Sequence, residues 1–523
     1  MTHDPGWDLV GTLGGGPSLF DDIRAEAVRL LGRTDPDPAP YPPRRTPPPE
    51  APAHSRRAAL APDEPERIAA VVARLTATGG PPDPTVLAHL DRRVRRLGRI
   101  GADHPVLTAI GRRALPRDRL AALARWSATR GEHLNAVRFG LLLAARHGGC
   151  GPYVLRRLGV IGDFTDAAIV AVRALPRDPE SLLLHMAAEA EGWARVGLVR
   201  ALRGSADPRV EEWLIRESCT GGVLDSYFCL IAAETGDLAG ALDRDEIDDE
   251  LLRGAGRLLA ALTDVDGPGT SIGSYEDGPR ALIRYLHHAT ARPPSTEWLL
   301  GLAGINRFLT RPSGAVERWG GRIRMLRAAY AKTLYAPGTP ALIEAAWHGT
   351  DPAEIRRAAW LARLLGLPYR AGLLKAMPSA PLESGLWYLL VDDCPDDEAQ
   401  TVFETAERLL PLADLRSPPA DCLGFGAGHE ADQCLDMVVS RLDRHPGLGR
   451  ALLVTALRNH TSRNRRMAVR ALQAWPVERW PPAVVDVLRA AHAEEGVDDL
   501  REKLAGLLRA EIAGLPDPAV RGS

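Results

Sequence analysis

The sequence predicts an all-α chain in which similar helical units stack into an irregular α-solenoid. The tetrapeptide Val-Arg-Ala-Leu occurs at residues 172–175, 199–202 and 469–472, and Arg-Ala-Leu-Pro-Arg-Asp occurs at 113–118 and 173–178. Apolar residues recur at helical spacing from about residue 65 onward, and no stretch keeps the two-residue period of a strand. Recurring helix ends of this kind are typical of stacked repeats, which usually hold a partner rather than run a reaction.

The N-terminal part predicts an arm and a spacer. Residues 1–34 begin Gly-rich and then allow a short amphipathic helix with one apolar face, formed by Phe20, Ile23, Ala27, Leu30 and Leu31. Nine of the nineteen residues in 35–53 are proline. Because proline fixes φ and donates no amide hydrogen, we expect 35–63 to be a disordered, stiff linker; a Pro-rich ligand for a partner domain is the alternative.

The helical body is expected at residues 64–513, with a tail at 514–523. Its clearest helix follows Thr350 and Asp351, either of which can cap the first turn, while Pro352 suits that turn because it lacks an amide hydrogen. The helix has one apolar face, made of Ile355, Ala358, Ala359, Ala362 and Leu365. Gly366 can end it in a left-handed conformation.

Similar starts precede three other segments. Asp178-Pro179 and Asp207-Pro208 each open a helical pattern, and residues 463–474 form another before Pro476. Asp-Pro followed by arginine and a small-residue apolar face resembles the second helix of HEAT or armadillo repeats. The resemblance implies a HEAT-like solenoid over most of the chain, with uneven helix pairs and insertions. Such solenoids serve as scaffolds, receptors, nucleic-acid readers and occasionally lyases or glycosylases.

Composition narrows the class of protein. The formal net charge is −2 and 45% of the residues are hydrophobic, which favours neither nucleic acid nor a membrane as a general partner. Residues 1–16 lack the features of a signal peptide, and no apolar stretch is long enough to span a bilayer. The six cysteines form no Cys-x-x-Cys pair, so we expect reduced, mostly buried thiols in a cytoplasm. Arginine outweighs lysine strongly, as is typical of GC-rich bacterial genomes.

A basic segment is the main candidate for binding. Between residues 91 and 130, eleven arginines stand against three acids, an excess of eight positive charges. The candidate binding patch comprises Arg92, Arg93, Arg95, Arg96, Arg99, Arg112 and Arg113. Such a patch could contact phosphate backbones or an acidic protein, although a solvated helix face is the commoner role of such residues.

Signals for chemistry are weaker. Residues 423–429, followed by Cys434, resemble the haem-binding loop of cytochromes P450, and Glu354 with Arg357 resembles the Glu-x-x-Arg pair of that family. The resemblance implies a haem thiolate at Cys434, but Phe425 lies nine residues before it where the family has seven. Residues 243–250 lack the glycine and glutamate positions of an EF-hand, so we interpret them as acids that stabilise a helix start.

Other candidates lack their structural context. His287 and His288 face different sides of a helix, and Ser271 in a Gly-x-Ser-x-Gly pattern has no preceding strand. We therefore expect no catalytic residue, no metal and no cofactor. Among the tryptophans in helical segments, we expect most to be core and a few to be exposed anchors for a partner; the five are Trp193, Trp213, Trp347, Trp360 and Trp475.

The function predicted from the sequence is a non-enzymatic, protein-binding scaffold or adaptor, whose partner the residues do not identify. Nucleic-acid binding through the segment from Arg92 to Arg130 is the first alternative. A haem-thiolate oxygenase that uses Cys434 is the second.

Overall fold

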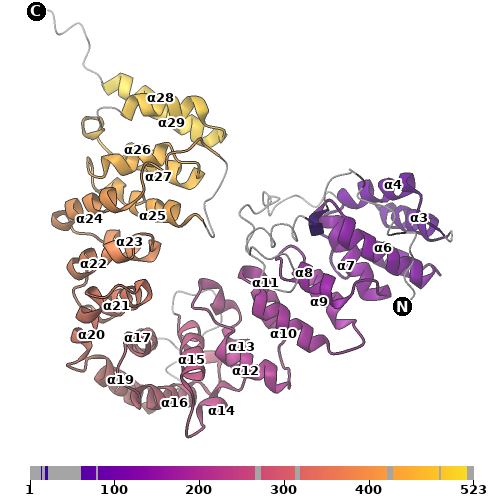
Figure 1. Ribbon diagram of the computed structural model, residues 1–523, viewed down its shortest axis with the longest axis horizontal. Coiled ribbons are helices and arrows are strands. Elements are labelled where there is room, and N and C mark those ends of the chain that lie inside the picture. Colours follow the sequence, from indigo (N-terminus) through magenta and orange to yellow (C-terminus); the bar gives the residue numbers. More distant parts are fainter. Residues whose placement is uncertain are drawn as a thin grey trace, which may run out of the picture. The chain divides into compact units, whose positions relative to one another are not determined.

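The computed structural model describes Trp7, Leu13 and residues 18–21, 61–77, 80–264, 272–311, 319–420, 428–481 and 484–514. Within these residues the regular structure is helical, and no strand occurs (Figure 1). The all-α prediction is confirmed. The Pro-rich segment 35–53 lies outside the described residues. Ser271 and Phe425 also lie outside them, together with most of the Gly-rich stretch around each.

Two compact units make up the chain. Unit 1 comprises Met1–Ala291 and Phe308–Leu326, and unit 2 comprises Arg292–Arg307 and Arg327–Ser523. The helices α17 (Thr296–Thr310) and α19 (Gly321–Leu334) each contribute residues to both units. None of the described helices is both long and apolar enough to cross a membrane.

Unit 1 is a series of short helices in which each helix packs on near neighbours in sequence. Its helices are α3 (Glu64–Thr76), α4 (Pro84–Arg95), α5 (Pro105–Gly111), α6 (Arg117–Arg130), α7 (Leu134–His147), α8 (Pro152–Gly159), α9 (Thr165–Arg173), α10 (Pro179–Glu189), α11 (Gly192–Ala201), α12 (Pro208–Arg216), α13 (Cys229–Thr235), α14 (Leu238–Leu242), α15 (Asp249–Leu262) and α16 (Gly278–Thr290). One row runs through α7, α9, α11, α13 and α15, each packed on the next, and α8 packs on α10 beside it. This alternation of two rows is the packing of an α-solenoid.

Unit 2 repeats the arrangement more regularly. Its helices are α20 (Thr339–Trp347), α21 (Pro352–Leu365), α22 (Arg370–Ala376), α23 (Ser384–Val391), α24 (Asp396–Leu409), α25 (Glu430–Val439), α26 (Arg450–Leu457), α27 (Ser462–Ala474), α28 (Val484–Glu494) and α29 (Asp498–Gly514). The odd-numbered helices from α21 to α29 form one row, and α24, α26 and α28 form the other (Figure 1). Short 3₁₀ turns occur in the connections of both units, at Val223–Tyr227, Ile272–Ser274, Met377–Ser379, Leu442–Arg444 and Val477–Arg479.

The predicted helix starts are present. The Asp351 carboxylate accepts a hydrogen bond from the amide of Ala353 at 3.0 Å, and Gly366 ends α21 with φ +68°. Asp207 caps α12 in the same way, through the amide of Arg209 at 2.9 Å. The apolar face predicted for α21 is fully buried. Local sequence therefore determines where these helices begin and end.

The repeated peptides lie mostly at helix junctions. The two Arg-Ala-Leu-Pro-Arg-Asp copies connect α5 to α6 and α9 to α10. Two Val-Arg-Ala-Leu copies fall at the ends of α9 and α11, whereas the third, at residues 469–472, lies inside α27. Gln473 and Ala474 complete α27 after that copy, so the helix ends before Pro476, as the sequence predicts.

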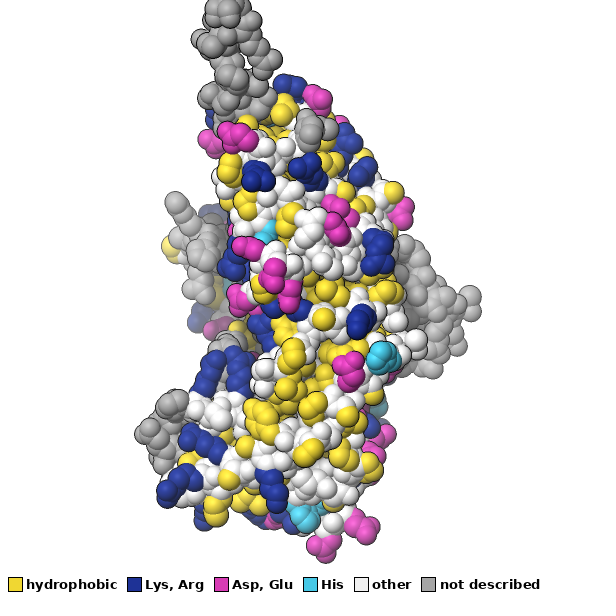
Figure 2. All heavy atoms as spheres, turned by 90° about the vertical axis from the view of Figure 1, so that its left-hand side faces the viewer, with side chains coloured by type: hydrophobic (Ala, Val, Ile, Leu, Met, Phe, Trp, Pro, Cys, Tyr) yellow, Lys and Arg dark blue, Asp and Glu magenta, His cyan; other side chains and the backbone are white. Residues whose placement is uncertain are grey.

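The surface of the helical body carries charges of both signs. Figure 2 shows one face, on which hydrophobic side chains form an extended area below the middle and Lys and Arg side chains gather at the lower left. Asp and Glu side chains lie among the basic ones over the upper part. No field of a single sign covers this face, which agrees with the near-zero net charge of the sequence.

Candidate functional site

A groove in unit 1 is the first candidate site. It lies along α6 and α8 and the C-terminal ends of α7 and α9, and its cavity volume is about 1310 Å³. Its lining combines aromatic rings with basic side chains, namely Trp126, Tyr153, Arg117, Arg125, Arg130 and His147. We refer to it as the α6–α8 groove. An aromatic and cationic lining of this kind suits a segment that carries apolar anchors and an acid.

Close helix packing forms the wall of the groove. A Cβ atom added at Gly140 of α7 would lie 2.4 Å from the backbone nitrogen of Ala128 in α6, so only glycine permits this approach. After α7 the chain turns at Gly149, which has φ +106°. A Cβ atom there would lie 2.0 Å from the carbonyl oxygen of Ala121. The two glycines therefore bring the α7–α8 connection against α6.

Side chains from the N-terminal arm form part of the lining of this groove. Trp7 is 3% exposed, and the guanidinium carbon of Arg119 lies 5.6 Å from its ring centre. Phe20 is 9% exposed and packs edge-on against Tyr153, with ring centres 6.2 Å apart. Phe20 lies 97 positions and Trp7 lies 110 positions before Arg117, the first residue of α6, so tertiary contacts rather than local folding bury them.

Polar contacts fix the same segment. The backbone nitrogen of Leu19 donates to the carbonyl oxygen of Gly131 at 3.2 Å. The Asp21 carboxylate lies 3.4 Å from the Arg130 guanidinium and accepts a hydrogen bond from the Ser18 hydroxyl at 2.8 Å. Residues 19–21 are helical, in agreement with the start of the predicted amphipathic helix; Ile23, Ala27, Leu30 and Leu31 lie outside the described residues.

The electrostatic environment of the groove is positive. Burial lowers the pKa of His147, and the neighbouring Arg117 and Arg146 lower it further. Burial also raises the pKa of the Cys150 thiol to about 12, so this cysteine is not a thiolate at neutral pH. The groove thus favours an acidic ligand and offers no activated cysteine nucleophile.

The predicted basic patch has a different environment. Five of its seven arginines have a carboxylate within 4.0 Å: Arg93 with Glu64, Arg95 with Asp91, Arg99 with Asp166, and both Arg112 and Arg113 with Glu66. Arg92 and Arg96 are exposed and have no ion-pair partner among the described residues. None of the seven lines the α6–α8 groove; Arg117, Arg125 and Arg130 of the same basic segment do.

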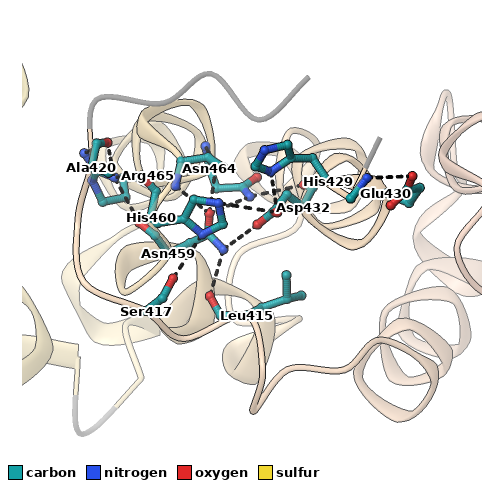
Figure 3. A network of polar contacts seen from close by, with 12 residues as sticks. Leu415, Ser417, Ala420, His429, Glu430, Asp432, Asn459, His460, Asn464 and Arg465 are labelled. Atoms are coloured by element: carbon teal, nitrogen blue, oxygen red, sulfur yellow. Dashed lines mark hydrogen bonds and ion pairs between the residues drawn. The ribbon is translucent and has the colours of Figure 1, made fainter. Parts of the chain in front are cut away.

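A cluster of two histidines and one aspartate in unit 2 is the second candidate site. His429 lies at the start of α25, Asp432 lies in the first turn of that helix, and His460 lies just before α27. One ligand atom from each side chain lies within 4.8 Å of the others. Figure 3 shows both imidazoles turned toward the Asp432 carboxylate. Of these three residues, the sequence indicated only His429, as part of the loop 423–429 that resembles a haem-binding loop.

The residues considered earlier for catalysis or metal binding are explained by the fold. Cys434 lies inside α25, fully buried, and burial raises the pKa of its thiol to about 12, which does not favour a thiolate ligand. Glu354 and Arg357 pair with each other at 2.7 Å within α21. Asp248 caps α15 through the amide of Leu251 at 2.8 Å, as the acidic stretch predicted.

Cysteine and tryptophan burial follows the predictions in large part. Of the five cysteines that the structure describes, four are buried and Cys394 is half-buried, and none forms a disulfide. Trp213, Trp347 and Trp475 are buried, and Trp360 is half-buried. Trp193 is 59% exposed and packs against Tyr227, with ring centres 4.8 Å apart and ring planes tilted by 57°.

Comparisons with known proteins leave the chain without a family. No family model matches it, and no curated protein matches it. Among solved structures it is similar to a circular tandem repeat protein with novel repeat topology and enhanced subunit contact surfaces, at 14% sequence identity and a TM-score of 0.13. That match covers 86% of this chain and 94% of the other. The assignment of a helical repeat fold therefore rests on the two rows of helices in each unit.

Proposed function

We propose that this chain is a protein-binding scaffold of HEAT-like helical repeats, and that the α6–α8 groove takes a segment with aromatic anchors and an acidic residue. The observation that carries the proposal is that Trp7, Phe20 and Asp21 from the chain's own arm line that groove and contact Arg119 and Arg130 of α6 and Tyr153 of α8. An intramolecular segment of this kind has the chemistry expected of an external ligand for the same groove.

Because the arm is covalently linked to the groove, it lowers the apparent affinity of the groove for an external partner. A segment joined to its groove by a linker competes at an effective concentration in the millimolar range, without any new contact. An external segment must therefore bind much more tightly than the arm, or the arm must leave. The arm would thus restrict the groove to strong ligands and keep its aromatic lining covered.

The test uses the full-length chain and a fluorescein-labelled peptide of residues 1–24, followed by fluorescence anisotropy. In a Trp7→Ala/Phe20→Ala variant the arm loses both anchors, so the peptide should bind more tightly than to the unmodified chain. Adding Arg130→Glu to this variant should weaken peptide binding, because that residue faces Asp21 in the groove. The matched control adds Arg203→Glu, an exposed arginine of unit 1 outside the groove.

Two results would contradict the proposal. One is equal affinity for the unmodified chain and the Trp7→Ala/Phe20→Ala variant. The other is equal weakening by Arg130→Glu and Arg203→Glu, because a general loss of positive charge would then explain the effect. The alternative is nucleic-acid binding through the basic segment from Arg92 to Arg130, and a steep loss of binding with salt would be its signature.

A further inference from the structure

We propose that His429, Asp432 and His460 bind one divalent transition-metal ion, through His429 Nδ1, Asp432 Oδ2 and His460 Nε2. One ligand atom from each of the three side chains lies within 4.8 Å of the others. The Asp432 oxygen is 3.1 Å from His429 Nδ1 and 3.6 Å from His460 Nε2. Two imidazole nitrogens and a carboxylate oxygen are the donor set of zinc and of mononuclear iron sites, rather than of calcium or magnesium.

Two of the three separations between donor atoms are close to those of a tetrahedral metal site. Zinc holds imidazole nitrogen and carboxylate oxygen at about 2.0–2.2 Å, so neighbouring ligand atoms of a tetrahedral site are roughly 3.3–3.5 Å apart. The two measured separations, 3.1 Å and 3.6 Å, lie on either side of that range. The separation of 3.6 Å between His460 Nε2 and Asp432 Oδ2 exceeds hydrogen-bond length, so this nitrogen faces the carboxylate without a hydrogen bond to it.

Neighbouring side chains fix the direction of each donor. The Ser417 hydroxyl lies 3.0 Å from His460 Nδ1, which directs the opposite nitrogen, Nε2, toward Asp432. The Asn459 amide donates to Asp432 Oδ1 at 2.8 Å and leaves Oδ2 for the histidines. Second partners of this kind hold the ligands of metal sites in one orientation (Figure 3).

The support around Asn459 is itself buried and hydrogen-bonded. Its side-chain oxygen accepts from the Thr461 backbone nitrogen at 2.9 Å, and its side-chain nitrogen also donates to the Leu415 carbonyl oxygen at 2.8 Å. Asn464 donates to the same Asn459 oxygen at 3.1 Å. Asn459 and Asn464 are at most 1% exposed, so the ligands are attached to a rigid polar network.

Solvent can reach the site from one side. The His460 side chain is 29% exposed and the His429 side chain is 14% exposed, whereas Asp432 is 7% exposed. An ion can therefore enter, and coordination positions beyond the three protein ligands face water or a partner's donor atom. The partial positive charge at the start of α25 opposes a cation weakly, and the negative charge of the Asp432 carboxylate offsets it.

The experiment titrates the untagged, chelator-treated full-length chain with Co²⁺ and follows its visible absorption. One Co²⁺ should bind per chain, and Zn²⁺ should displace it. His460→Gln and Asp432→Asn should each weaken binding by at least about tenfold, which is the lower end of what loss of a supporting contact alone costs. The matched control is His348→Gln, which replaces an exposed histidine of the same unit.

A second measurement needs no variant. The electron paramagnetic resonance spectrum of the unmodified chain with one equivalent of Cu²⁺ should show two nitrogen ligands. The proposal is overturned if no ion binds, if the spectrum shows fewer than two nitrogens, or if His460→Gln and Asp432→Asn bind Co²⁺ as the control does. None of these outcomes depends on the arm or the α6–α8 groove, so the two proposals can fail separately.

Discussion

Arg465→Ala should destabilise unit 2 by about 3–5 kcal/mol, the cost of removing one partner of a buried ion pair. The Arg465 and Glu495 side chains are 2% and 0% exposed, and Arg465 Nε donates to the Glu495 carboxylate at 2.7 Å. The same guanidinium donates to the carbonyl oxygens of Asn459 at 2.9 Å and His460 at 2.8 Å. The substitution leaves a buried charge and two buried carbonyl groups without these partners.

The matched control is Arg489→Ala, which removes an exposed pair from the same unit. Arg489 and Asp486 are 2.8 Å apart, with side chains 60% and 85% exposed, so the expected loss is about 0–1 kcal/mol. Urea denaturation followed by circular dichroism measures both variants. If Arg465→Ala costs no more than Arg489→Ala, the buried pair does not stabilise unit 2 and the reasoning is refuted.

Three further predictions concern titration, packing and thiol reactivity. Burial raises the pKa of Glu495, but hydrogen bonds from Arg465 outweigh this effect and leave the pKa below its ordinary value. The ionised Glu495 therefore stabilises the fold above about pH 4, and this stabilisation is lost at lower pH. Thermal melting across pH 3–6 should show a fall in melting temperature that Glu495→Gln lacks. Gly140→Val should destabilise unit 1 by more than about 2 kcal/mol in urea denaturation, because its Cβ would meet the Ala128 backbone; an equal cost for Gly304→Val, where a Cβ has open space, would contradict this. Among the five described cysteines, Cys394 should react first with a thiol reagent in the folded chain, since the other four are buried; unchanged fast labelling in Cys394→Ser would contradict it.

Sequence determined the helices more completely than the sites. Asp351, Pro352 and Gly366 specify a helix through contacts within one or two turns, so the bounds of α21 could be predicted without tertiary structure. The basic segment was also a useful signal, because Arg117, Arg125 and Arg130 line the α6–α8 groove. The seven arginines predicted as the binding patch are not the ones that line the groove. Only the fold determines which arginines form ion pairs with carboxylates.

The two sites depend on contacts between distant residues. Asp21 meets Arg130 from 109 positions away, and no local spacing indicates that contact. His429 and Asp432 are three residues apart, which was the only local sign of a metal site, but His460 joins them only because α25 packs on α27. Trp193 is an exposed member of the five tryptophans in apolar helical segments, and the sequence predicted that a few of them would be exposed without indicating which.

The docked arm is tested most directly by ¹⁹F NMR of the full-length chain containing 5-fluorotryptophan, with the Trp7 resonance assigned by its loss in Trp7→Phe. The 59% exposed Trp193 provides an internal reference for a solvated ring. The account predicts a Trp7 resonance shifted from its position in the free peptide of residues 1–24 and insensitive to exchange of H₂O for D₂O. A Trp7 resonance at the peptide position, with the same solvent isotope shift as Trp193, would contradict it.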